Sequence, residues 1–266
     1  MELTIYVVDA FSKDRFGGNS AAVVPLNEWI SPALMQKIAS ENNLSETAFI
    51  KQVAENRYEI RWFSPLTEID FCGHATLASA AVILNQLGAQ GELEFVTQEV
   101  GELQVVQLDD GRIEMSFPNQ APEVEHQVPP ALLAGLSIPP QQVLKNRQAY
   151  FAVLASEAEV RAVQYDSEQL KQLAPFDVVV TAKADEETDY DFVSRYFWPA
   201  NGGDEDPVTG SIHSGLTPYW ATQLAKSELV ALQASKRTGT LYCKISDDRV
   251  LVSGYGVLYL AGKVFV

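Results

Sequence analysis

Two of the three histidines in this 266-residue chain stand where an apolar helix is predicted to begin. His74 directly follows Gly73, and His213 lies shortly after Gly210. The start of a helix has unpaired N–H groups and partial positive charge, which disfavours a charged imidazole. We therefore expect neutral histidines there, each able to donate one hydrogen bond and accept another in a pocket. Simple packing at a helix start is the alternative for both.

Glu46 is the first candidate for proton transfer. It stands at the mouth of a predicted apolar strand, close to Ala48 and Phe49. A carboxylate beside apolar side chains is suited to carry a proton to and from a substrate. The alternative is an ordinary solvated residue at the start of a strand.

A second acidic group, residues 204–206, precedes the helix predicted after Gly210. Asp206 is the most restricted of the three because Pro207 limits the backbone of the residue before it. Cys72 precedes Gly73, and a helix start lowers the pKa of a thiol, so a thiolate base is also conceivable. The alternative for Cys72 is an inert, buried thiol.

The helices predicted at 74–87 and 211–224 are apolar nearly all round, so each is expected to be buried as the axis of its own half. Helix starts at Gly73 and Gly210 that faced one cleft would form a small anion site, most naturally for a carboxylate. The alternative is that both glycines only let the chain turn into a buried helix.

Composition excludes several classes of protein. The net charge of −16 argues against binding to nucleic acid or to an anionic membrane surface. The chain shows neither a signal peptide at its N-terminus nor an apolar run of about 18 residues, so we expect a cytoplasmic protein. Three histidines without Cys-x-x-Cys or His-x-x-x-His spacing indicate no metal site, and the absence of glycine-rich phosphate loops predicts no nucleotide cofactor.

The elements that must position these residues occur twice. RWFSP at 61–65 and RYFWP at 195–199 share an Arg-aromatic-Phe-x-Pro pattern, and each is followed by a glycine and an apolar helix. A strand, a helix and another strand precede each copy, which predicts two similar halves. Six prolines between 118 and 140 indicate the junction. We expect an α+β protein with halves at 1–118 and 119–256, and a last strand, 257–266, that returns to the first half.

Five blocks of sequence resemble the phenazine-biosynthesis PhzF-like isomerases. These blocks are VDAF (8–11), FGGNSAAVV (16–24), LSETAF (44–49), FCGHAT (71–76) and EDPVTGS (205–211). The resemblance implies the fold of diaminopimelate epimerase, in which each half wraps a mostly antiparallel, barrel-like sheet around a central helix and the active site lies between the halves. It also implies a homodimer that works without a cofactor.

The resemblance assigns roles residue by residue. The catalytic positions of the family correspond to Glu46, His74 and Asp206. Its substrate-holding positions correspond to Asn19, Gly73, Gly210 and Ser211. Ser20 follows Asn19 where most members have proline, a departure that affects the loop but leaves the Asn19 side chain available.

The favoured hypothesis is an isomerase that moves a proton on a small carboxylate metabolite bound between the halves. A racemase or epimerase that uses Cys72 with Glu46 is the first alternative, although Thr209 stands where a second thiol would be needed. A non-catalytic carboxylate-binding protein is the second alternative, but binding alone does not require Glu46.

Overall fold

Helix α2 (Gly73–Asn85) is the centre of the first half of the chain. In the computed structural model, which describes residues 1–266, every residue of α2 from Gly73 to Leu84 is buried. Small residues such as Ala75, Ala78 and Ser79 let the strands approach closely on all sides. The helix therefore forms the buried axis that the sequence predicts, although it ends before Leu87. Its last N–H bonds go back to Val82, and Gly88 then turns the chain with a φ of 80°.

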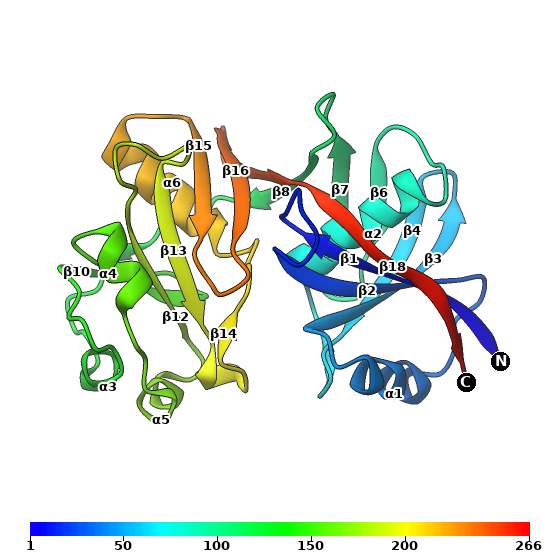
Figure 1. Ribbon diagram of the computed structural model, residues 1–266, viewed down its shortest axis with the longest axis horizontal. Coiled ribbons are helices and arrows are strands. Elements are labelled where there is room, and N and C mark those ends of the chain that lie inside the picture. The colour runs from blue at the N-terminus through cyan, green and yellow to red at the C-terminus, as the bar shows by residue number, and fades with distance from the viewer. The chain divides into compact units, whose positions relative to one another are not determined.

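A mixed, mostly antiparallel sheet wraps around α2 (Figure 1). Its strands follow the order β18–β1–β2–β3–β4–β6–β7–β8, with β2–β3 and β4–β6 parallel. Strand β5 pairs with the end of β4. The strands are β1 (Glu2–Ala10), β2 (Asn19–Leu26), β3 (Glu46–Ala54), β4 (Arg57–Phe63), β5 (Glu68–Ile69), β6 (Leu93–Val96), β7 (Glu102–Gln107), β8 (Ile113–Pro118) and β18 (Gly256–Phe265).

Helix α1 (Pro32–Asn42) packs against the same sheet and has the bounds that the sequence predicts. Ser31 caps its first turn by accepting a hydrogen bond from the N–H of Leu34. Met35 and Ile38 bury their side chains in a cluster with Phe49 and Phe63 of the sheet. This second layer fixes β3, the strand that begins at Glu46.

The second half repeats this plan around helix α6 (His213–Leu224). Its strands follow the order β9–β10–β11–β12–β13–β15–β16, and β14 pairs with the end of β13. The strands are β9 (Glu123–Val124), β10 (Gln142–Lys145), β11 (Ala149–Val153), β12 (Asp177–Lys183), β13 (Phe192–Phe197), β14 (Glu205–Asp206), β15 (Glu228–Gln233), β16 (Gly239–Ser246) and β17 (Arg249–Gly254). The other helices are α3 (Pro130–Ala134), α4 (Glu157–Ala162), α5 (Ser167–Leu170), η1 (Lys171–Leu173) and η2 (Pro199–Asn201).

Helix α6 differs from its prediction in two respects. It begins at His213 rather than at residue 211, because the N–H groups of His213 and Ser214 bond to Gly210 and Ser211 in tight turns. It is buried from His213 to Thr217 and at Trp220, while its last turn reaches the surface. Only the first part of α6 is therefore a buried axis.

The two halves share one topology, as the repeated motif predicts. In both, one strand carries the repeated motif: β4 in unit 1 and β13 in unit 2. This strand pairs antiparallel with the strand before it and parallel with the strand after the central helix. The arginine of each copy makes a double hydrogen bond to a glutamate of the next short strand. Arg61 contacts Glu68 at 2.7 Å and 2.7 Å, and Arg195 contacts Glu205 at 2.7 Å and 2.9 Å.

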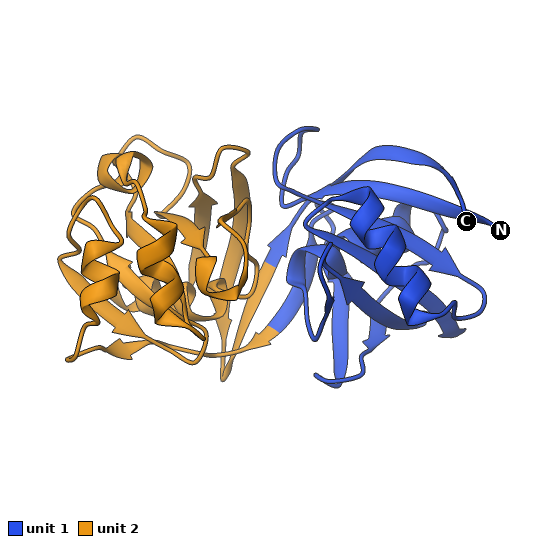
Figure 2. Ribbon diagram, turned by 90° about the horizontal axis from the view of Figure 1, so that it is seen from below, with its two compact units in different colours: residues 1–116, 253–266 blue, residues 117–252 orange.

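The chain folds as two compact units (Figure 2). Unit 1 comprises Met1–Ser116 and Ser253–Val266, and unit 2 comprises Phe117–Val252. Within unit 1 the first and last strands pair along their length, so the two termini lie side by side. The last strand, β18, belongs to unit 1 together with residues 253–255. No helix is both long enough and apolar enough to cross a membrane.

Replacing a central side chain of α2 tests whether this helix supports unit 1. Leu77 is fully buried, so Leu77→Ala is expected to lower the free energy of unfolding by about 2–5 kcal/mol. Leu66 is 78% exposed, and Leu66→Ala should change it by less than about 0.5 kcal/mol. Urea unfolding followed by circular dichroism measures both. Equal effects would show that α2 is not the core.

Candidate active site

A buried contact between a carboxylate and an imidazole lies at the start of α2. Glu46 is the first residue of β3, and His74 is the second residue of α2. Oε2 of Glu46 lies 2.7 Å from Nε2 of His74, and the two side chains are only 12% and 6% exposed. The contact has the distance of an ion pair and lies almost entirely out of solvent.

Asn19 contacts the ring nitrogen of His74 that faces away from Glu46. Oδ1 of Asn19 accepts a hydrogen bond from the hydroxyl of Ser45 at 3.0 Å. Nδ2 of Asn19 lies 3.2 Å from Nδ1 of His74. The neutral ring accepts a hydrogen bond at Nδ1 and keeps its Nε2–H group toward Glu46, whereas the charged ring carries a proton on both nitrogens.

The turn before Asn19 depends on a glycine and on a buried aspartate. Gly18 has a φ of 63°, and a Cβ there would lie 2.1 Å from the carbonyl oxygen of Ala10. Asp9 accepts hydrogen bonds from the N–H of Phe16 and from the hydroxyl of Ser20. Ser20 thus supplies a bond that proline cannot make. Sequence reasoning missed Asp9, although an acid in the apolar run of β1 was a signal.

The protonation of His74 differs from the expectation. Burial works against a charged imidazole, yet the contacts with Cys72 and the negative charge of Glu46 outweigh it and hold the pKa of His74 well above its usual value. The shift is opposite in direction to the one expected from the helix start alone.

Cys72 is the buried thiol that was the alternative to a thiolate base. Burial, followed by the charge of Glu46, raises the pKa of Cys72 to about 11. The sulfur lies 3.4 Å from Nδ1 of His74, and the group is a thiol at neutral pH.

His213 is neutral, as predicted, but for a different reason. Burial lowers its pKa to about 4, opposed only by its bond to the carbonyl of Thr209 at 2.9 Å. The Nδ1–H group makes that bond, and Nε2 is buried without a partner. His213 lies inside unit 2 against Phe192, in the packed position that was the alternative for this residue.

Asp206, Gly210 and Ser211 come together in unit 2. Asp206 lies in β14 and is half-buried, and one of its carboxylate oxygens accepts a hydrogen bond from the hydroxyl of Thr209. The segment from Asp206 to Ser211 leads into α6, and no side chain caps that helix. No side chain caps α2 either, so the N–H groups of Gly73 and His74 have no acceptor within the chain.

Gln233 fixes the segment from Asp206 to Ser211 by hydrogen bonds, a role that the sequence analysis did not predict. Its side chain is fully buried, and its amide donates to the carbonyl of Asp206 at 2.8 Å. Its Oε1 accepts from the N–H of Thr209 at 2.8 Å. The available signal was the alternation of β15, where Leu229 and Ala231 face inward and the next inward position is polar.

Glu46, Cys72 and His74 are also the residues that could hold a metal ion, since their donor atoms all lie within 4.8 Å of one another. A cation would have to displace protons from Cys72 and His74, whose pKa values are both raised. The arrangement is thus better suited to holding and moving protons.

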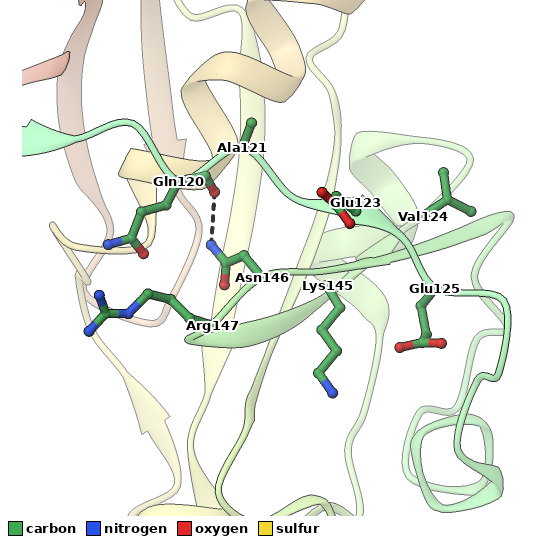
Figure 3. A pocket seen from close by; sticks show the side chains of 8 residues that line it. All are labelled: Gln120, Ala121, Glu123, Val124, Glu125, Lys145, Asn146 and Arg147. Carbon is green, nitrogen blue, oxygen red and sulfur yellow. Dashed lines mark hydrogen bonds between the residues drawn. The ribbon is translucent and has the colours of Figure 1, made fainter. Parts of the chain in front are cut away.

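A hollow of about 440 Å³ in unit 2 contains none of the predicted site residues (Figure 3). It is lined by Gln120, Ala121, Glu123, Val124, Glu125, Lys145, Asn146 and Arg147. Its walls mix acidic and basic side chains, so it does not form a uniform anion site.

Known proteins with similar sequences and structures include isomerases and epimerases. An uncharacterised isomerase of Pseudomonas aeruginosa is 45% identical over 99% of each chain. The crystal structure of a PhzF family protein from Enterococcus faecalis superposes with a TM-score of 0.94 at 40% identity over the whole of both chains. A hydroxyproline epimerase from Agrobacterium vitis shares the fold, with a TM-score of 0.56 at 10% identity over 99% of this chain and 92% of its own.

The family described as phenazine biosynthesis-like protein matches residues 8–262. The chain belongs to this family and is an isomerase with the α+β fold that it shares with diaminopimelate epimerase-like enzymes.

The pKa values of the two buried histidines should be shifted in opposite directions from the usual value of histidine. Nuclear magnetic resonance of the three imidazoles should show His74 protonated above pH 6.5, whereas His213 stays neutral until the pH falls toward about 4. Glu46→Gln should lower the pKa of His74, because it removes a neighbouring negative charge. The contribution of His74 to the free energy of unfolding is complete below the pKa that His74 has in the unfolded chain. It is lost as the pH rises through the pKa of His74 in the folded protein. A His74 that titrates below 6.5 would contradict the contact.

Gln233→Met tests the support of the Asp206 segment. The substitution keeps the size of the side chain but leaves Thr209 N–H and Asp206 C=O unpaired, which should lower the free energy of unfolding by about 1–3 kcal/mol. Gln141 is exposed, so Gln141→Met is the matched control. Urea unfolding measures both, and equal values would show that the buried hydrogen bonds are unimportant.

Proposed function

We propose that this protein is a cofactor-independent isomerase that moves a proton between carbon atoms of a small carboxylate metabolite. The buried contact between Oε2 of Glu46 and Nε2 of His74 is the single observation that carries the proposal. A carboxylate in short contact with an imidazole in a buried site is suited to accept a proton from a substrate carbon and to return it.

His74 supports this role by its position. Its Nε2 lies 2.7 Å from Oε2 of Glu46, close enough to share a proton with the base during the transfer. Nδ2 of Asn19 lies 3.2 Å from Nδ1 and helps to hold the ring in place. After the proton arrives, Glu46 returns it to another carbon, so no oxidant, metal or second substrate is consumed.

The helix starts supply a place for the carboxylate of the substrate. Uncapped N–H groups at Gly73 attract an anion, and those at Gly210 and Ser211 do the same in unit 2. In this proposal these N–H groups bind the carboxylate of the substrate, and Asp206 orients the substrate.

A racemase that uses Cys72 receives less support, since the raised pKa of Cys72 leaves little thiolate at neutral pH. A homodimer in the cytoplasm, with no nucleic-acid or membrane partner, completes the proposal. The homodimer derives from the family resemblance, and the acidic net charge of −16 supports the absence of nucleic acid.

Deuterium uptake from D₂O tests the reaction. Proton spectra of a panel of dihydroaromatic, hydroxy and amino acids should show exchange at one carbon with the wild-type protein. Glu46→Gln keeps the size of the side chain but cannot accept the proton, so exchange should slow by at least about a hundredfold. Glu41→Gln is the matched control because Glu41 is exposed on α1 of the same unit.

Each other outcome contradicts a defined part of the proposal. Exchange that survives in Glu46→Gln but stops in Cys72→Ala would make Cys72 the base. Line broadening of a carboxylate without any exchange would indicate binding without this reaction. No exchange and no binding across the panel would contradict the assignment of a small carboxylate substrate.

A further inference from the structure

Strand register shows that Asp177 occupies in unit 2 the position that Glu46 occupies in unit 1. Glu46 is the parallel neighbour of Ala21, and Asp177 is the parallel neighbour of Ala149. The residue after each acid pairs with the phenylalanine of the repeated motif, as Thr47–Phe63 and Val178–Phe197. Both acids are the first residues of their strands.

The same correspondence relates the other site residues. Gly210 matches Gly73, so Ser211 stands in the place of His74. Gln148, which precedes Ala149, stands in the place of Ser20. Unit 2 therefore holds an acid and a polar residue just before its central helix at the positions that Glu46 and His74 occupy in unit 1.

A chain of hydrogen bonds joins Asp177 to Ser211. The hydroxyl of Tyr196 donates to Oδ2 of Asp177 at 2.6 Å, and Asn201 donates to Oδ1 at 2.7 Å. Nε2 of Gln148 donates to Oη of Tyr196 at 3.0 Å and to Oγ of Ser211 at 3.0 Å. The Tyr196 side chain is only 4% exposed at the centre of this chain.

The direction of these bonds follows from the acid at one end. Both oxygens of Asp177 accept, so Tyr196 must donate its only proton to that carboxylate. Burial and the negative Asp177 raise the pKa of Tyr196 well above its usual value, so it keeps this proton. The oxygen of Tyr196 can then only accept, which fixes the amide of Gln148 with its N–H₂ group toward Tyr196 and Ser211.

We propose that Gln148 is a positioning residue that makes Ser211 a hydrogen-bond donor for the carboxylate of the substrate. Because Oγ of Ser211 already accepts from Gln148, its own proton is available for an acceptor outside the chain. An anion binds best to such oriented donors. This inference rests on the proposed function, since it assigns the carboxylate to Ser211.

The turn before Gln148 is held in place and supports this role. Oδ1 of Asn146 accepts from the N–H groups of Gln148 and Ala149 at 2.8 Å and 3.0 Å. Its Nδ2 donates to the carbonyl of Gln120 at 3.1 Å (Figure 3). The backbone of Gln148 is therefore fixed before any ligand binds.

Reversing the polarity of Gln148 tests the proposal, with benzoate as the carboxylate probe. Gln148→Glu replaces the amide donor by a carboxylate, which accepts the hydrogen bond of the Ser211 hydroxyl. With Ser211 retained, Gln148→Glu should raise the Kd of benzoate, measured by calorimetry, at least about tenfold over that of the wild-type protein. In the Ser211→Ala background the same change should have less than about a threefold effect, because only the added charge remains. Gln141→Glu adds the same charge on the exposed surface of unit 2 and should leave Kd unchanged.

A second measurement needs no ligand. The two side-chain amide hydrogens of Gln148, observed by ¹⁵N spectroscopy, should both be protected from exchange with solvent. Tyr196→Phe should expose one of them and Ser211→Ala the other. Unprotected amide hydrogens in the wild-type protein, or equal effects of Gln148→Glu with and without Ser211, would overturn the positioning role alone. A wild-type protein that binds no benzoate and shows no deuterium exchange with the acid panel would instead overturn the proposed function, and with it the role of Ser211.

Discussion

The complete burial of the first turn of α2 is the constraint on which the site depends. A helix start within the core places a polar side chain, His74, where water cannot satisfy it, so partners must come from the surrounding strands. Asn19 at the start of β2 and Glu46 at the start of β3 provide them. The tight turn at Gly18 and the bonds to Asp9 follow from the same need, because they deliver Asn19 to this position.

Duplication of one scaffold has produced two different sets of polar groups. In unit 1 these positions hold Glu46 and His74 in direct contact. In unit 2 they hold Asp177 and Ser211, which are joined through Tyr196 and Gln148 by hydrogen bonds. The strand register is common to both units, so the contacts differ because the side chains at matching positions differ.

Close neighbours and burial, rather than the helix dipole, decide the protonation of this site. The field of a helix start corresponds to about half a charge and fades within one turn. A carboxylate in contact exceeds it at His74, and loss of solvent exceeds it at Cys72 and at His213. Reactivity inferred from position along a helix therefore needs the surrounding strands before it can be assigned.

The sequence by itself determined the α+β class, the two similar units, the helix at Pro32–Asn42 and the candidate residues Glu46, His74 and Asp206. These follow from local patterns, because alternation, capping residues and a repeated motif are written along the chain. Only the tertiary structure revealed Asp9, Gln233 and the Asp177–Tyr196–Gln148 chain, and it alone showed that close contacts raise the pKa of His74 and that burial raises the pKa of Cys72. Those properties depend on which strands lie beside one another, and solvent exclusion and contact distance are set by pairings between residues far apart in the sequence.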